Sequence, residues 1–143
     1  MKALTIHPLP VEQMTCGQKT IEVRTWATNY RGDVLITSSA KKCYDTIPGH
    51  ALCVAELYDV RPLRRSDAEA ACMPAAHCTS NLFAWVFRNF RLIEPFAIKG
   101  KLSLWNFTET DKIKVIMPVA DFLNLPESEI EKLCEKYWNH LYI

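Results

Sequence analysis

Apolar and polar residues alternate along several short stretches of this chain. From Thr20 to Trp26 the alternation is strict, and it places Ile21 and Val23 on one face of a strand, opposite Glu22. Arg24 and Trp26 follow Glu22 on the second face, which is either solvated or the wall of a cleft. Similar patterns predict further strands over residues 3–6, 34–38, 51–60 and 113–117, a β run in residues 81–93 that ends at Pro95, and a short edge strand that ends at Trp105.

Two short helices are predicted between these strands. Pro8 and Pro10 are suited to the first turn of a helix, which we expect over residues 11–16 with Gly17 as a left-handed cap. A second helix is expected over residues 66–72, with Ser66 as its N-cap.

The clearest helix is at the C-terminus. Asn124 and Glu127 resemble a capping box, and Pro126 lies in the first turn. The apolar residues after it recur at three- and four-residue spacing, which is typical of one buried stripe: Ile130, Leu133, Cys134, Tyr137, Trp138 and Leu141. This stripe packs against the sheet or serves a protein partner; removal of all residues after Phe107 would distinguish the two.

Many short strands with small helices in the connections predict an α+β, mainly β fold, either a β-barrel or a rolled sheet. The 143 residues suit a single domain, 1–143, because the pattern contains no linker and no repeat. An apolar content of 49% and a charged content of 23% are those of a globular protein. No apolar run is long enough for a membrane helix, and the first residues lack a signal peptide, so we expect a cytoplasmic protein with no membrane partner.

Six cysteines do not form an obvious disulfide framework. Cys16, Cys53 and Cys134 occur in apolar patterns, where a thiol acts as a small hydrophobic group. Cys72, His77 and Cys78 lie close together in sequence, but without a CxxC pair a plain loop is favoured over a zinc site. We therefore expect no metal and no cofactor.

Charge is unevenly distributed although the net charge is only +1. Up to Lys101 there are 13 Lys and Arg against 9 Asp and Glu, and from Leu102 onward there are 4 against 7. The basic part suits a phosphate, but its excess is too small to imply a long nucleic-acid duplex.

Several segments in a fixed order carry a family resemblance. These segments are "LTIHPLP", "GQKTIEVRTW", "NYRGDVLITSSAKK", "GHALCVAELYDV" and "WVFRNFRLIEPFAIKGKLSLWNF". They contain a Gly-x-Lys-x-x-Glu-x-Arg box from Gly17 to Arg24, a Tyr-Arg-Gly turn at 30–32, and Ser38-Ser39 after a strand. In this order the chain resembles an ASCH domain of the PUA-like superfamily, of the small bacterial or phage type. The resemblance covers about residues 3–107, and residues 108–143 look like an added strand and helix.

This resemblance implies a small PUA-like β-barrel with short helices at its ends and a cleft for RNA, single-stranded nucleic acid or a modified nucleoside. Some similar proteins are amidohydrolases acting on N-acylcytidine, with the box lysine, a threonine three residues later and a glutamate as catalytic residues; another is a ribonuclease. Lys19 matches the lysine, whereas Glu22 stands at the threonine position. Glu56 and Glu69 are the candidates for the later glutamate.

From these residues we expect an RNA- or nucleotide-binding protein whose cleft is centred on the box. The alternative is a hydrolase that uses Lys19 with a carboxylate such as Glu22. For Lys19 three roles are open: a surface lysine, a phosphate contact or a catalytic base. Glu22 and Arg24 either form a simple ion pair or bind a ligand, with Glu22 accepting the amine of a base and Arg24 contacting a phosphate. The other expected ligand contacts are Trp26 for base stacking and the polar groups of Tyr30, Arg31, Ser38, Ser39 and Lys41.

Overall fold

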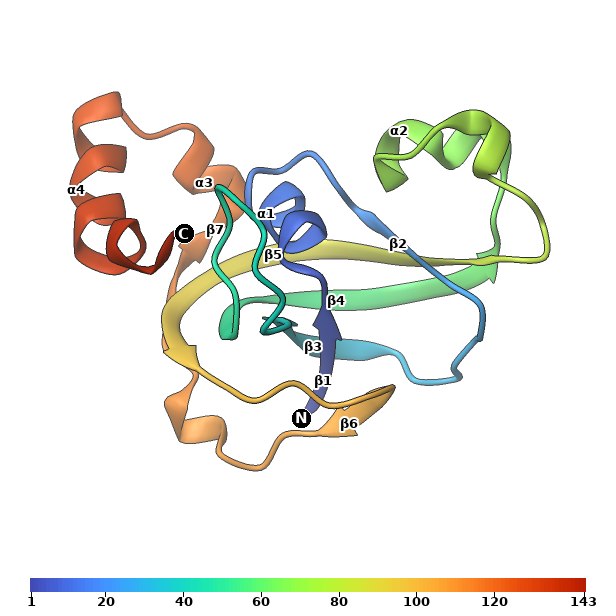
Figure 1. The fold of residues 1–143 in the computed structure, drawn as a ribbon, viewed down its shortest axis with the longest axis horizontal. Coiled ribbons are helices and arrows are strands. Elements are labelled where there is room, and N and C mark those ends of the chain that lie inside the picture. Colours follow the sequence, from blue (N-terminus) through green and yellow to red (C-terminus); the bar gives the residue numbers. More distant parts are fainter.

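The structure is a computed structural model that covers residues 1–143. Its strands and helices follow one another in mixed order, with short 3₁₀ helices in some connections (Figure 1). Their bounds are β1 Lys2–Ile6, α1 Pro8–Thr15, β2 Ile21–Arg24, β3 Gly32–Ser38, β4 His50–Pro62, α2 Ala68–Ala71, β5 Phe83–Ala97, β6 Leu104–Asn106, β7 Val115–Pro118, α3 Val119–Leu123 and α4 Glu127–Tyr137.

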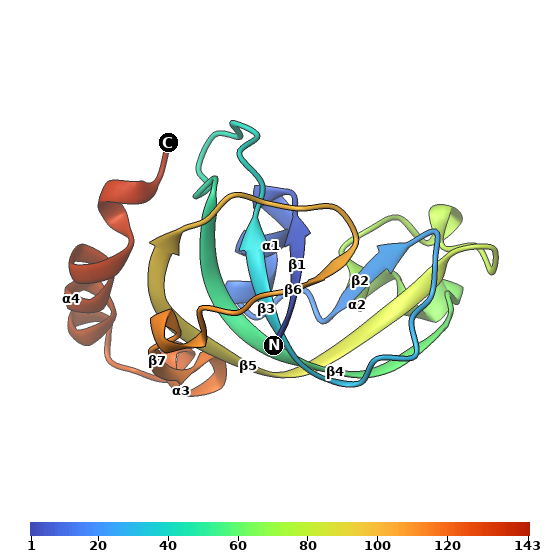
Figure 2. The same ribbon diagram turned by 90° about the horizontal axis from the view of Figure 1, so that it is seen from below.

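All seven strands form one mixed sheet. The strand order is β2-β5-β4-β3-β1-β6, and β7 adds to β5. Only β1 and β3 run parallel; the other pairs are antiparallel. The long strands β4 and β5 pair with three register shifts, and irregularities of this kind bend a strand. The sheet therefore curls into a half-barrel, with α2 and α4 at its opposite ends (Figures 1 and 2), and the predicted α+β, mainly β class is confirmed.

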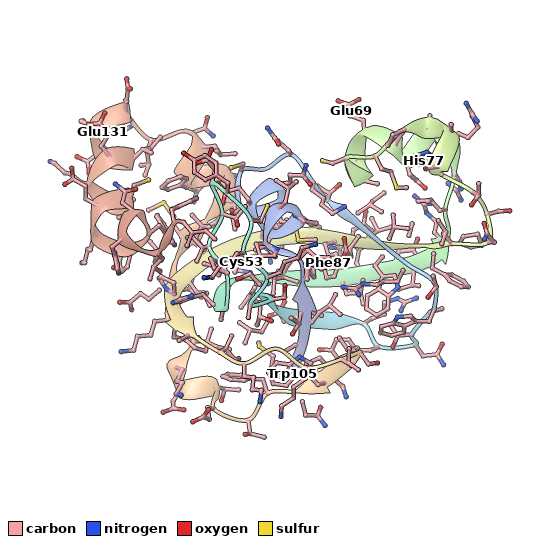
Figure 3. All side chains as sticks on the ribbon, viewed as in Figure 1. Cys53, Glu69, His77, Phe87, Trp105 and Glu131 are labelled. Atoms are coloured by element: carbon pink, nitrogen blue, oxygen red, sulfur yellow. The ribbon has the colours of Figure 1, made fainter.

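The concave side of the sheet holds the main apolar core. Trp85 and Phe87 from β5 are fully buried there, together with Cys53 from β4 and Met14 from α1. Figure 3 shows Cys53 and Phe87 in the middle of the molecule. Cys16, by contrast, is exposed and its thiol donates to a Glu12 carboxylate oxygen, so it does not act only as the small hydrophobic group that its apolar pattern predicts.

Strand β5 does not end at Pro95 as predicted, but continues to Ala97. On one side it still pairs with β4, through Ala51 and Phe96. On the other side β7 pairs only with residues 91–93. The pairing with β4 shifts register between Ala51 and Cys53, opposite the segment that contains Pro95. Proline is tolerated at such a bulge because a residue outside the regular ladder needs no N–H to donate, so this irregularity explains why Pro95 fits.

Gly17 has the predicted left-handed conformation after α1, with φ of 79°. The two side-chain caps predicted for the later helices are wrong. Ser66 is exposed and does not cap, because it lies inside the 3₁₀ helix Arg65–Asp67 and α2 begins only after Asp67. The carboxylate of Asp67 accepts a hydrogen bond from the backbone N–H of Arg64 at 2.8 Å. Helix α4 begins after Pro126 without a side-chain cap, and the amide of Asn124 donates to Ala120 O in the preceding turn.

The C-terminal segment packs against the half-barrel. Strand β7 extends the sheet, and Val119 and Trp138 are part of the main core. The rings of Phe122 and Trp138 meet edge to face, with centroids 5.6 Å apart. Other residues of the predicted apolar stripe are partly buried against the same core: Leu133, Cys134, Tyr137 and Leu141. None of the helices has the length and apolarity needed to cross a membrane.

Candidate functional site

A polar groove of about 600 Å³ lies where β1 meets the start of α1. Strand β2, the residues after β3 and the loop before β6 each contribute lining residues. Figure 2 shows the backbone of this loop passing across β1 and β3. The polar residues that line it come from all of these segments: Thr5, His7, Glu22, Arg24, Ser39, Lys99, Lys101 and Ser103. Three strong cations and one carboxylate thus face one hollow.

The β2 wall is ordered by a chain of charges. Glu22 is only 8% exposed, and its Oε2 lies 3.2 Å from an Arg24 nitrogen. The same Arg24 nitrogen donates to Thr5 O at 3.2 Å, which joins β2 to β1 across the groove floor. The Oε1 of Glu22 lies 3.4 Å from the Lys19 ammonium. Two cations therefore compensate one buried carboxylate, as a buried charge requires.

Lys19 lies behind this wall and does not line the groove. It is 5% exposed, and its ammonium donates to Ala71 O at 2.8 Å, the carbonyl of the last residue of α2. It lies at the junction between α1 and β2. The geometry makes it an anchor that links α2 to Glu22.

Two polar atoms beside the groove lack a hydrogen-bond partner. They are Nε of Arg24 and Oγ of Ser39, both shielded from water. Because buried polar groups are nearly always paired, an unpaired donor and an unpaired hydroxyl on two walls of one groove need an explanation. Neither atom is open to the groove, so a ligand could bond to them only after the walls had shifted.

The opposite wall, from Lys99 to Ser103, was not among the residues singled out from sequence. Gly100 packs closely on β1: a Cβ at this position would lie 2.5 Å from Cγ2 of Thr5. The backbone N–H of Lys101 donates to Thr5 Oγ1 at 3.2 Å, and its ammonium lies 5.0 Å from the centroid of the Trp105 ring. The Lys-Gly-Lys sequence at 99–101 is part of the last segment that carries the family resemblance, and it could have indicated from sequence that this loop contributes to the site.

Of the predicted ligand contacts, Arg24 and Ser39 line the groove together with Glu22, and the others lie elsewhere. Trp26 packs edge to face on Trp85, with centroids 4.6 Å apart. The Tyr30 hydroxyl donates to Asp33 O at 2.8 Å.

The remaining three predicted contacts also have local partners or none. Arg31 is exposed and donates to the carbonyls of Thr28 and Tyr30. Ser38 is fully buried and exchanges hydrogen bonds with the backbone of His50, whereas Lys41 is exposed in the loop after β3.

The carboxylates proposed as a second catalytic group also lie outside the groove lining. Glu56 forms a two-point ion pair with Arg88, at 3.0 and 3.2 Å. Glu69 is exposed on α2 (Figure 3). Glu22 is thus the carboxylate that the groove offers.

Near α2, the thiols of Cys72 and Cys78 donate to separate backbone carbonyls, those of Gln18 and Pro74. The structure contains no group of three His, Cys, Asp or Glu side chains placed to hold a metal ion.

Asp67 forms a further ordered charge pair, outside the groove. Its two carboxylate oxygens accept hydrogen bonds from Arg61 at 2.8 and 2.9 Å. The hydrogen-bonded guanidinium holds the pKa of Asp67 below its usual value, although burial acts in the opposite direction. This pair joins the end of β4 to the turn before α2. Helix α2 in turn accepts the hydrogen bond of Lys19, which pairs with Glu22 of the β2 wall.

The comparison with known proteins assigns the fold. A family profile for the ASCH domain matches residues 4–117, and the chain therefore belongs to the ASCH domain family. The crystal structure of ASCH from Zymomonas mobilis superposes with a TM-score of 0.59 at 13% identity, covering 95% of this chain and 94% of that one. Among curated proteins, none matches this sequence significantly.

Two mutant structures of the Zymomonas mobilis protein are also similar to this chain. A tyrosine-to-phenylalanine mutant has a TM-score of 0.57 at 13% identity, with 95% of this chain and 97% of that chain covered. A serine-to-alanine mutant has a TM-score of 0.53 at 14% identity, with 95% of each chain covered. At this identity the likeness establishes the shared fold.

Proposed function

We propose that this protein binds RNA or a nucleotide in the polar groove. The observation that carries the proposal is that Arg24, Lys99 and Lys101 line one hollow. Three cations from segments far apart in sequence suit a phosphate group. A volume of about 600 Å³ is in the range of sites that take one small molecule, such as a nucleotide.

Glu22 adds a second kind of contact. A carboxylate beside phosphate-binding cations repels a phosphate but accepts hydrogen bonds from the amino group of a base. A ligand that has both an anion and an amine, such as cytidine or adenosine in a single strand or as a free nucleotide, therefore fits better than inorganic phosphate. Single-stranded nucleic acid exposes these base edges, whereas a duplex hides them.

The test is a titration at low salt with a short single-stranded RNA, the matching DNA and a cytidine nucleotide. Lys99→Ala and Lys101→Ala should each weaken binding about ten- to a hundredfold, since a charge-assisted contact contributes about 1.5–3 kcal/mol. Lys132→Ala, an exposed lysine on α4, is the matched control and should bind normally. Absence of binding to all three ligands, or equal losses in the control, would refute the proposal.

A second candidate is a hydrolase of N-acylcytidine or of RNA, and the fixed position of Glu22 favours it. Because Lys19 points away from the groove to Ala71 O, Glu22 and not Lys19 would touch the substrate. In amide hydrolysis the carboxylate would take a proton from water, the oxygen of that water would attack the acyl carbon, and the C–N bond would break as the amine regained the proton. Arg24 would stabilise the oxyanion.

Incubation with N-acylcytidine, and separately with RNA, separates the two candidates. Turnover that disappears in Glu22→Gln while ligand binding persists would establish the hydrolase. If neither substrate changes although the wild-type protein binds RNA or nucleotide, the enzyme candidate is rejected and the binding function stands.

A further inference from the structure

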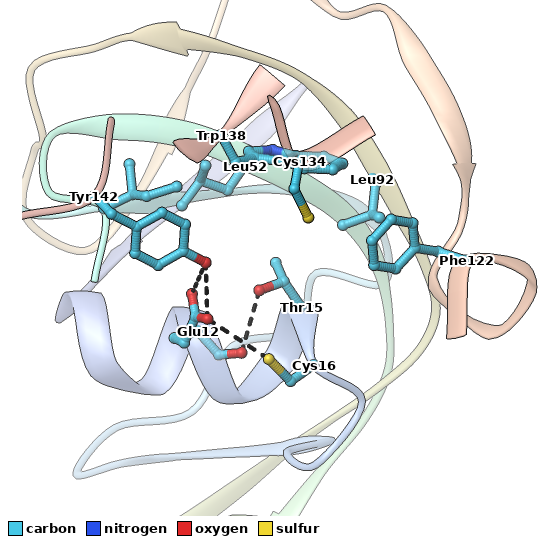
Figure 4. Close-up of a pocket in the computed structure, with 10 residues that line it drawn as sticks. Glu12, Thr15, Cys16, Leu52, Leu92, Phe122, Cys134, Trp138 and Tyr142 are labelled. Carbon is cyan, nitrogen blue, oxygen red and sulfur yellow. Dashed lines mark hydrogen bonds between the residues drawn. The ribbon is translucent and has the colours of Figure 1, made fainter. Parts of the chain in front are cut away.

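A second hollow lies between the half-barrel and the C-terminal segment. It has a volume of about 230 Å³ and is lined mainly by apolar side chains, among them Leu52, Leu92, Phe122 and Trp138 (Figure 4). It shares no lining residue with the polar groove. An engineered apolar cavity of about 150 Å³ binds benzene, so a hollow of this size has room for a substituted aromatic ring.

One side of this hollow carries a carboxylate. The oxygens of Glu12, on α1, accept the Tyr142 hydroxyl at 2.8 and 2.9 Å, and the Cys16 thiol lies 3.6 Å from Oε1 (Figure 4). Both donors are neutral, and Glu12 takes part in none of the ion pairs of the structure. A carboxylate can accept more hydrogen bonds than one hydroxyl and one thiol supply.

Glu12 thus differs from the other carboxylates described above. Glu22, Glu56 and Asp67 each have an arginine partner, whereas Glu12 faces an apolar hollow without a cation. A partly buried negative charge without a counterion favours a cationic ligand, because the ligand supplies both the charge and the missing donors.

The C-terminus closes this side of the hollow. The backbone of Ile143 pairs with Asp45 N at 3.0 Å and Thr46 O at 3.1 Å, which holds the preceding Tyr142 over Glu12. Burial and the hydrogen bond to Glu12 raise the pKa of Tyr142, so its hydroxyl remains a donor.

We propose that this hollow is a binding site for a small primary amine with an apolar body. The ammonium group would pair with Glu12, and the apolar body would lie against Leu92, Phe122 and Trp138. The site is independent of the proposed nucleic-acid function, because the two hollows share no lining residue. An anion of the same shape would be repelled by Glu12, and a neutral analogue would lose the ion pair.

Phenethylamine, propylbenzene and 3-phenylpropionate test this ligand class, because they have similar apolar bodies and a positive, neutral or negative end. Titrations followed by amide chemical shifts in the full chain should show the tightest binding for the amine, with shifts around Leu52, Leu92 and Phe122. Equal affinity for the three probes, no binding at millimolar concentration, or shifts confined to the polar groove would overturn the proposal.

Variants then test the role of Glu12. Glu12→Gln should weaken phenethylamine binding about tenfold and leave propylbenzene unchanged, since only the ion pair is lost. Glu131→Gln, on the outer face of α4 (Figure 3), is the matched control and should have no effect. Tyr142→Phe should tighten amine binding several-fold, because it frees the carboxylate. An unchanged amine affinity in Glu12→Gln, or an unchanged or weaker one in Tyr142→Phe, would contradict the assignment.

Discussion

Individual charged residues of this protein have different roles according to their burial. Lys19 is buried and bound to a carbonyl and a carboxylate, whereas Lys101 is exposed and lines the groove from a loop. Removing one partner of a buried charge leaves the other uncompensated, and this is costly. An exposed lysine can be removed with little effect on stability. The two lysines should therefore be separable by experiment.

Lys19→Met should lower the free energy of unfolding by about 2–4 kcal/mol, because Glu22 and Ala71 O lose their shared donor. Lys101→Met should change it by less than about 0.5 kcal/mol while weakening RNA binding. Urea denaturation followed by tryptophan fluorescence measures the first quantity, and the RNA titration measures the second. Unchanged stability in Lys19→Met would show that Lys19 is not an anchor.

Asp67 should make stability depend on pH in the acid range. Its pKa in the folded state is lowered by Arg61, whereas in the unfolded chain it is about 3.9. The contribution is therefore complete above about pH 4 and is lost as the pH falls below this value, because the unfolded state takes up the proton first. Asp67→Asn should cost about 1–3 kcal/mol at pH 7 and flatten the acid limb of the stability curve.

Denaturation curves at several pH values test this expectation. Asp111→Asn, at an exposed position, is the matched control and should keep the wild-type pH dependence. A parallel loss of stability at every pH in Asp67→Asn would mean that the ion pair with Arg61 is not the source of the effect.

At the scale of elements, the C-terminal segment completes the half-barrel. Strand β7 pairs with β5, and α3 and α4 bring Phe122 and Trp138 together over the core. Trp138 is 8% exposed although most of α4 is solvated. The helix is thus attached through one apolar stripe, and this answers the question that the sequence left open between packing and a free partner surface.

Trp138→Ala should destabilise the protein by about 3–5 kcal/mol, the usual cost of removing a buried tryptophan. Removal of residues 108–143 should prevent stable folding, since it deletes both β7 and this contact. Thermal unfolding monitored by circular dichroism is the measurement. A truncated protein that melts at the wild-type temperature would show instead that the segment is free to bind a partner.

At the scale of the whole molecule, the groove gathers positive charge that the net charge of +1 conceals. If Arg24, Lys99 and Lys101 each neutralise a phosphate, the logarithm of the RNA affinity should fall against the logarithm of salt concentration with a slope of about −2. Lys101→Ala should reduce this slope by about 0.7. Fluorescence anisotropy with labelled RNA at several salt concentrations measures both slopes. An affinity that does not depend on salt would contradict phosphate contact in the groove.

Much of the fold could be predicted because local patterns follow directly from strand and helix geometry. The alternation in β2 places Glu22 and Arg24 on one face, as predicted. The predicted strand end at Pro95 is wrong because the tolerance for proline depends on a register shift in the pairing of β5 with β4, which the local sequence does not show. Trp26 was expected to stack on a base, but it packs on Trp85, a residue that the sequence does not show to be near.

By itself, the sequence determined the mainly β class, the family and the polar face of β2, since strand periodicity and an ordered set of motifs are local properties of the chain. Only the tertiary structure decided that Lys19 lies behind Glu22 and that Lys99 and Lys101 face Arg24. These contacts join segments far apart in the chain, and the curvature of β4 and β5 sets which of them meet. The same curvature and the packing of the C-terminus place Tyr142 on Glu12, beside a hollow that no local pattern reveals.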